Sequence, residues 1–220
     1  MPIDPKYLSD FCENGIYHIY NRTNNKERLF LSDDDKSVFF EKYDRYLTPF
    51  IDTYAWSLLP NHFHLLNRVK SISSIEANLS AIPFKELVQT EKKFLEGQIS
   101  LSKLIQQSFK RFFQSYAIHF NNSHLRKGNL FYRPFKRIEV CKESQFTKAI
   151  VYIHANAKKH QLVEDFSEWG WSSWQTYLSD SPTRLLREEV LEWFGGRELF
   201  IKTHEQMIEY YYQNEISIED

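Results

Sequence analysis

Two histidines separated by one residue are the part of the sequence best suited to chemistry. His62 and His64 lie in the stretch PNHFHLL at residues 60–66. Because side chains two apart on a β-strand project from the same face, both imidazoles are expected side by side, with Phe63 on the other face. Paired imidazoles bind a divalent metal when a further ligand comes from elsewhere in the chain. The pair predicts either such a site or, since this spacing also arises by chance, an ordinary polar face.

Charge is unevenly distributed along a chain whose formal net charge is only -1. Residues 97–138 contain eight Lys and Arg residues and no Asp or Glu, whereas residues 164–220 contain thirteen acidic residues and four basic ones. Aromatic residues alternate with the basic ones in 97–138, which is typical of a surface that binds single-stranded nucleic acid, although the same aromatics could form a core. The candidate phosphate contacts are Arg22, Lys110, Arg111, Arg133, Lys136 and Arg137.

The elements that would position these residues follow from hydrophobic periodicity. Strands are predicted at 15–23, 53–59, 62–69 and 130–140. Helices are predicted from 33 to about 48, at 100–122, at 143–159, and from 187 onward with a break at Gly195-Gly196. The order strand, helix, strand, strand, helix, strand is that of a split βαβ. We therefore predict an α+β, ferredoxin-like antiparallel sheet with helices on one face, plus a helical C-terminal extension.

The chain of 220 residues is expected to form a domain over 1–180, with an insertion at 71–98, and an acidic helical extension over 181–220. The two cysteines, Cys12 and Cys141, are too few and too far apart for a disulfide scaffold or a cysteine zinc module. No signal peptide and no apolar run long enough to span a membrane is seen, so we expect a cytoplasmic protein with no membrane partner.

Six ordered motifs together resemble the REP-associated tyrosine transposases, which belong to the single-tyrosine HUH transposases. The motifs are YHIYNR at 17–22, AWSLLPNHFHLL at 55–66, SYAIHFN at 115–121, GNLFYRPFKR at 128–137, YIHAN at 152–156 and WSS at 171–173. The resemblance covers roughly residues 15–176. Six motifs in this order are far more specific than the histidine pair alone.

The resemblance implies a mechanism and a set of site residues. In the family, the histidine pair holds Mg²⁺ or Mn²⁺ against a scissile phosphate, and a tyrosine on the long helix attacks the phosphorus to form a 5′-phosphotyrosine. Tyr116 matches that tyrosine, although it also lies on the apolar stripe of its helix and could belong to the core. The family's third metal ligand lies about one helical turn past the tyrosine. Asn121 is the match for that ligand, with His119 as the alternative.

We therefore expect a metal-dependent DNA transposase that cleaves and rejoins single-stranded DNA near hairpins. The alternative is a non-catalytic module on the same fold that binds nucleic acid by its sequence or its hairpin shape. The expected partners are single-stranded or hairpin DNA. The acidic extension could serve as the contact of a homodimer, as a site for another partner or as a cover for the basic face.

Overall fold

The computed structural model describes residues 4–24 and 27–213. Its centre is a four-stranded antiparallel sheet in the order β2-β3-β1-β4, built from β1 (Ile16–Arg22), β2 (Ile51–Leu59), β3 (His62–Val69) and β4 (Lys136–Glu139). This confirms the α+β class and the antiparallel sheet. β4 is shorter than the predicted strand at 130–140 and lies at the edge of the sheet, where the preceding Pro134 interrupts no central ladder.

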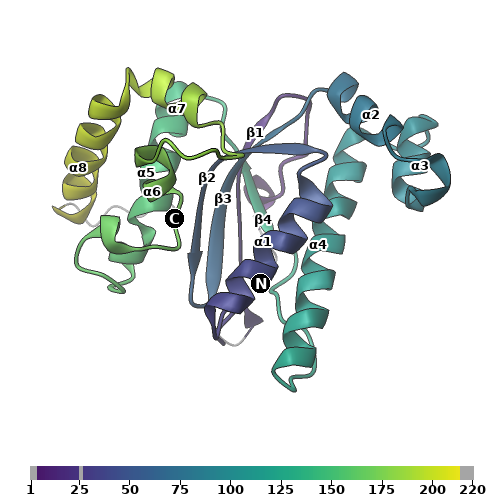
Figure 1. Ribbon diagram of the computed structural model, residues 1–220, viewed down its shortest axis with the longest axis horizontal. Coiled ribbons are helices and arrows are strands. Elements are labelled where there is room, and N and C mark those ends of the chain that lie inside the picture. The colour runs from purple at the N-terminus through teal and green to yellow at the C-terminus, as the bar shows by residue number, and fades with distance from the viewer. Residues whose placement is uncertain (1–3, 25–26, 214–220) are drawn as a thin grey trace.

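Helices cover both faces of the sheet, so the prediction that they lie on one face was wrong. Figure 1 shows the sheet between α1 and α4 on one side and α5 to α8 on the other. The physical reason lies in the strands, because the side chains of β1 and β3 are buried on both faces rather than on alternate residues only. A sheet buried on both faces needs a cover on each.

The first cover consists of α1 (Asp33–Leu47) and α4 (Leu101–Ser123). A capping box at Ser32 and Asp35 begins α1, as the sequence predicts for a hydroxyl followed by acids. α4 has an apolar stripe that packs with α1 on the sheet face carrying Phe63. The core between them is largely aromatic and includes Phe39, Phe63 and Phe112.

The second cover is α5 (Glu143–Lys159), which is followed by η4 (Phe166–Glu168), α6 (Trp174–Leu178), α7 (Arg187–Phe194) and α8 (Arg197–Gln213). Gly195 adopts a left-handed conformation between α7 and α8, where an L side chain would be strained. The predicted extension thus packs against α5 as part of a second core. Residues 214–220 of that prediction lie outside the described residues.

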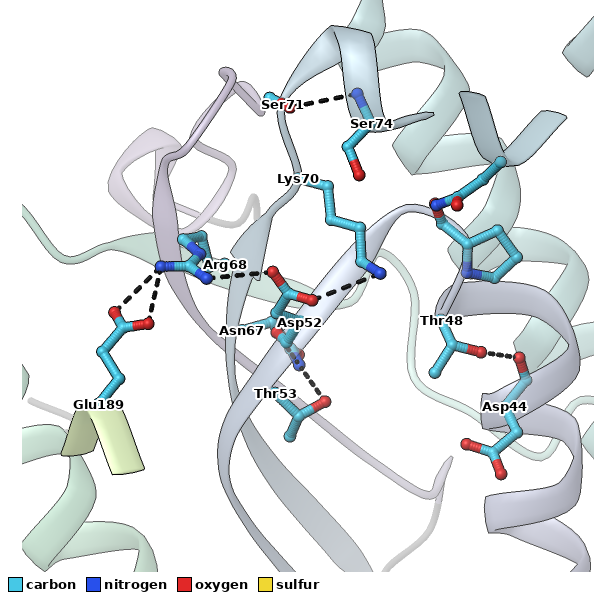
Figure 2. Close-up of polar contacts among 12 residues, drawn as sticks. Asp44, Thr48, Asp52, Thr53, Asn67, Arg68, Lys70, Ser71, Ser74 and Glu189 are labelled. Carbon is cyan, nitrogen blue, oxygen red and sulfur yellow. Dashed lines mark hydrogen bonds and ion pairs between the residues drawn. The ribbon is translucent and has the colours of Figure 1, made fainter. Parts of the chain in front are cut away.

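Figure 2 shows one polar attachment between the extension and the sheet. Arg68 on β3 donates to both carboxylate oxygens of Glu189 on α7, each at 3.0 Å, and to Asp52 on β2 at 3.2 Å. Lys70 lies 3.4 Å from the same Asp52 carboxylate. The bidentate contact fixes α7 at the end of β3 that is farthest from His62.

The insertion predicted at 71–98 contains α2 (Ile72–Ser80), η3 (Phe84–Glu86) and α3 (Gln89–Leu95). Ser71 caps α2 through the Ser74 N–H at 3.2 Å, a contact that Figure 2 includes. A further short 3-10 turn, η1, spans Pro5–Tyr7. Within the described residues, the helices are all too short or too polar to cross a membrane.

Candidate active site

His62 and His64 lie on the face of the sheet that α5 covers. Phe63 points to the opposite face, into the core beneath α1 and α4, so the predicted alternation holds. The antiparallel register places Tyr20 of β1 opposite His64 and Arg22 opposite His62. Each imidazole therefore lies in a row of neighbouring side chains on this face of the sheet: His64 beside Tyr20, and His62 beside Arg22.

Each imidazole has one ring nitrogen engaged by a polar neighbour. His62 Nδ1 lies 2.6 Å from Asn61 Oδ1, and because a carbonyl oxygen can only accept, the ring donates there. His64 Nδ1 lies 2.9 Å from Nε2 of His18 on β1. In the neutral tautomer that the Asn61 contact favours, His62 carries its lone pair on Nε2, which can ligate a metal.

Burial lowers the pKa of His64 well below its usual range, and the positive charges that His18, His62, His160 and Lys159 can carry lower it further. The side chain of His64 has no exposed surface. The imidazole is therefore neutral at pH 7, which is the form that binds a metal ion.

Tyr152 on α5 faces His64 and His18. Its ring centroid lies 5.6 Å from that of His64 and 5.9 Å from that of His18, edge-on in both cases. The Lys159 ammonium lies 3.5 Å from the phenol oxygen. A tyrosine hydroxyl, a cation and the imidazole of His64 thus come together on the α5 side of the sheet, which the sequence analysis did not predict.

Asn156 follows Tyr152 by one helical turn, and His160 follows Asn156 by another. Residues four apart share a helix face, and the two ends of this stripe contact the histidine pair: Tyr152 touches His64, and the His160 ring lies 4.8 Å from that of His62. Asn156 lies between them and is fully buried. Among the described residues, no hydrogen-bond partner is seen for its side-chain oxygen or nitrogen.

These donors fit a divalent metal. Among the described residues, no group of three His, Cys, Asp or Glu side chains is arranged to hold an ion, so a third protein ligand would have to be another kind of side chain. Asn156 supplies an amide oxygen on the same helix stripe as Tyr152 and His160, whose rings contact the histidines. A buried amide without a hydrogen-bond partner costs free energy of folding unless it binds a ligand such as a metal ion. Two imidazoles and an amide oxygen suit Mn²⁺, and Mg²⁺ when substrate oxygens complete the shell.

Tyr116 is not brought together with the histidines. It lies on α4, on the opposite side of the sheet, fully buried among the rings of Phe39, Phe120 and Phe131. Its hydroxyl donates to the Leu29 carbonyl at 2.8 Å, and burial raises the pKa of the phenol far above its usual range. In this arrangement the residue is part of the core, which is the alternative that its position on the apolar stripe left open.

The two candidates for the third ligand also lie away from the pair, because both are on α4. Asn121 donates to the Gly128 carbonyl at 2.9 Å and accepts from Arg126 at 3.1 Å, which holds the loop after the helix. His119 lies 3.4 Å from the Ser123 hydroxyl one turn further along. Both contacts are local to the C-terminal end of α4.

Two of the six predicted phosphate contacts lie beside His62. Arg22 and Lys136 line a cavity of about 290 Å³ together with His62, His160 and Tyr132. Arg133 is exposed in the loop between two of these lining residues.

The other three predicted phosphate contacts lie elsewhere. Lys110 is exposed on α4. Arg111 pairs with Glu91 at 2.9 Å. Arg137 is buried and donates to the carbonyls of Ser9 and Leu8, which makes it an internal support for the N-terminal segment.

A signal for the missed residues is present in the sequence. Tyr152 and Asn156 are four residues apart on the helix predicted at 143–159, and His160 follows at the same spacing just past its end, which places a hydroxyl, an amide and an imidazole on one side. The YIHAN motif at 152–156 carries the first two. Sequence alone does not say that this face, rather than that of Tyr116, packs on the histidines.

No protein-family model matches the chain, and no curated protein is significantly similar to it in sequence. A solved structure of a REP-associated tyrosine transposase bound to a REP hairpin is similar in fold, with a TM-score of 0.51. The similarity covers 79% of this chain and 86% of that one, at 14% sequence identity. An identity this low supports the shared fold only.

Proposed function

We propose that this protein is a DNA-strand transferase of the tyrosine transposase type, which cleaves and rejoins single-stranded DNA near a hairpin and uses Tyr152 as its nucleophile. The observation that carries the proposal is the contact of Tyr152 with His64 on the sheet face that holds both histidines. The fold shared with a transposase bound to a hairpin supports the choice of substrate. The motifs that resemble this family support it independently.

The chain's own groups suit this reaction. The Tyr152 oxygen would form the new bond to phosphorus while the bond to the 3′ oxygen breaks, leaving a 5′-phosphotyrosine and a 3′-hydroxyl. The phenol loses its proton and the departing oxygen gains one. Lys159, with its ammonium 3.5 Å from the phenol oxygen, stabilises the negative charge that builds there.

His62, His64 and Asn156 would hold the divalent metal. When bound, the ion would neutralise phosphate charge and fix the phosphate's orientation. His18 contacts Nδ1 of His64, and Asn61 contacts Nδ1 of His62. These contacts orient both rings before any ligand binds. The energy of the phosphotyrosine ester makes rejoining independent of a nucleotide cofactor.

A non-catalytic nucleic-acid-binding module is the second candidate, and one observation favours it. Tyr152 is only 4% exposed and His64 is fully buried, so a phosphate reaches the phenol only if the side chains around it shift. A module that only binds DNA needs no such opening.

The test is formation of a covalent protein–DNA adduct. Labelled hairpins with randomised single-stranded flanks are incubated with the protein and Mn²⁺, and adducts are separated on a denaturing gel. We expect the wild type to form an adduct that EDTA abolishes. Tyr152→Phe is expected to abolish the adduct while binding survives, because the substitution removes only one oxygen.

Tyr116→Phe is the matched control, since it removes the same atom on the other side of the sheet. It is expected to form the adduct at the wild-type level. An adduct that persists in Tyr152→Phe and disappears in Tyr116→Phe would return the nucleophile to Tyr116. No adduct from the wild type under any metal condition would favour the binding module.

A further inference from the structure

The cavity beside His62 has a lining suited to a particular part of a DNA strand. We propose that it binds one unpaired nucleotide next to the phosphate at the histidines, with its base on the Tyr132 ring and its phosphates at Arg22 and Lys136. The inference rests on the proposed function, since the histidine pair is taken to hold the scissile phosphate. It adds a subsite that requires a base at one position of the strand.

The charge of the lining fits an anion. Arg22 lies directly opposite His62 in the β1–β3 register. Its side chain therefore leaves the sheet beside His62, where the phosphate would lie. Lys136 occupies the neighbouring row, opposite Tyr20, and its ammonium lies 5.4 Å from the centroid of that ring. Among the described residues that line the cavity there is no Asp or Glu. Two cations without a carboxylate between them favour phosphate.

Tyr132 supplies a flat surface for a base. Tyr132 is 38% exposed, and the Arg22 guanidinium lies 5.4 Å from the centroid of its ring. The Tyr132 N–H donates to the Arg22 carbonyl at 2.9 Å, so the backbone holds the two residues together before any ligand binds. Bases stack on such rings with little regard to sequence, and the stack is worth about 1–3 kcal/mol per base.

The size and polar groups of the cavity limit what it admits. At about 290 Å³ it lies at the lower end of the range for small-molecule sites, which suits a single nucleotide and not a base pair. Asn21 and Asn61 also line it. The oxygen of each accepts a hydrogen bond, from the Arg22 N–H at 2.9 Å and from His62 at 2.6 Å. Each amide therefore keeps its NH₂ group as a donor for base or phosphate oxygens.

The experiment measures binding of labelled hairpins with single-stranded flanks by fluorescence anisotropy. It uses Tyr152→Phe as the background, so that cleavage plays no part. A single abasic nucleotide is moved through the flanks. We expect one position at which loss of the base weakens binding by about 5- to 150-fold, the range that a stacking energy of about 1–3 kcal/mol gives.

A double-mutant cycle then assigns that position to the cavity. Tyr132→Leu should weaken binding of the intact strand by a similar factor and should make the abasic substitution at that position nearly neutral. Tyr132→Phe keeps the ring and should restore both effects. Arg22→Gln and Lys136→Gln should each make the slope of log K against log salt shallower by about 0.7, whereas Lys202→Gln, at an exposed position on α8, should not.

The outcomes separate this inference from the proposed function. Abasic positions that all bind equally, or an abasic effect that persists unchanged in Tyr132→Leu, would overturn the subsite even if the wild type forms the covalent adduct. Coupling between Tyr132 and one base in a protein that forms no adduct would support the subsite and overturn the cleavage reaction.

Discussion

A buried tyrosine can serve a protein through its ring or through its oxygen, and Tyr116 and Tyr152 differ in this respect. Tyr116 packs among rings and gives its hydroxyl to a backbone carbonyl. Tyr152 has its oxygen near an ammonium and its ring beside two imidazoles. The first environment predicts a structural role and the second a chemical one.

Removal of the Tyr116 hydroxyl should therefore affect stability. In Tyr116→Phe the buried Leu29 carbonyl loses its donor, and we expect the free energy of unfolding to fall by about 1–3 kcal/mol. Urea denaturation followed by circular dichroism measures this. Tyr132→Phe, at an exposed side chain, is the control and should change little. Equal midpoints for Tyr116→Phe and the wild type would contradict the structural role.

His18 is expected to act on metal binding through His64. If His64 Nε2 ligates the metal, its Nδ1 donates to His18 Nε2, and loss of that acceptor leaves the ring less well oriented. We expect His18→Phe to weaken Mn²⁺ binding by about 10- to 100-fold, as measured by electron paramagnetic resonance of free Mn²⁺. His18→Gln, which retains an acceptor, should recover part of the affinity. Wild-type affinity in His18→Phe would remove His18 from the site.

At the scale of elements, α5 connects the sheet to the C-terminal extension through a directed chain of hydrogen bonds. His204 on α8 donates from Nδ1 to the Phe200 carbonyl, so its Nε2 accepts from His154 Nδ1 at 2.9 Å. His154 Nε2 then accepts from the Ser173 hydroxyl at 2.7 Å, and that oxygen accepts from the Trp56 N–H on β2. The chain requires both imidazoles to be neutral.

This chain predicts that stability falls in mild acid. Burial lowers the pKa of His204 to about 4 and that of His154 well below its usual range. Because the unfolded histidines titrate near 6.5, the unfolded state binds more protons below that pH. The stabilisation is complete above about pH 6.5 and is lost as the pH falls toward 4. His204 alone accounts for up to about 3 kcal/mol.

The measurement is urea unfolding at several pH values between 7 and 4. His204→Gln offers an oxygen to His154 but cannot titrate, so its stability should depend less on pH in this window. Carboxylates such as Asp35, whose pKa is lowered by its hydrogen bonds to His124 and to the backbone, lose their contribution at lower pH. A variant with the same slope as the wild type between pH 6.5 and 4 would show that His204 is not the source.

At the scale of the whole molecule, one sheet is shared by two cores, so the extension should stabilise the entire fold. Phe200 on α8 is fully buried, whereas its neighbour Leu199 is half exposed. We expect Phe200→Ala to lower the free energy of unfolding by about 3–5 kcal/mol and Leu199→Ala to change it by about 0.5 kcal/mol or less. In Phe200→Ala, the backbone amides of the strands should also lose protection from hydrogen exchange. If α8 alone loses protection, the extension is a separate unit.

The order of elements was predictable because each has a strong period or cap. The helix at 143–159 and the strand at 62–69 have the predicted bounds, and the acids after Ser32 begin α1 as expected. The insertion at 71–98 shows no comparable period, and its short helices were missed. The pairing of histidines on one face also followed from the period of two.

What the sequence could not supply is which helix covers which face of the sheet. Both α4 and α5 carry a tyrosine on a buried stripe, and periodicity treats the two alike. Only the three-dimensional arrangement separates Tyr116 from the histidines and brings Tyr152 to them. The cavity depends on the register of β1 with β3, which joins residues forty positions apart, Arg22 and His62.

The buried His154–His204 pair, together with His62 and His64, also makes the molecule suitable for nuclear magnetic resonance. A ring N–H that is held in a hydrogen bond away from water exchanges slowly, so the donors of His154 and His204 should give separate downfield proton signals. Nitrogen-15 shifts of their rings should report the Nδ1–H tautomer for both. Addition of diamagnetic Zn²⁺ should move the ring signals of His62 and His64 and leave the other pair in place. The His154–His204 pair is thus an internal reference against which occupancy of His62 and His64 can be followed.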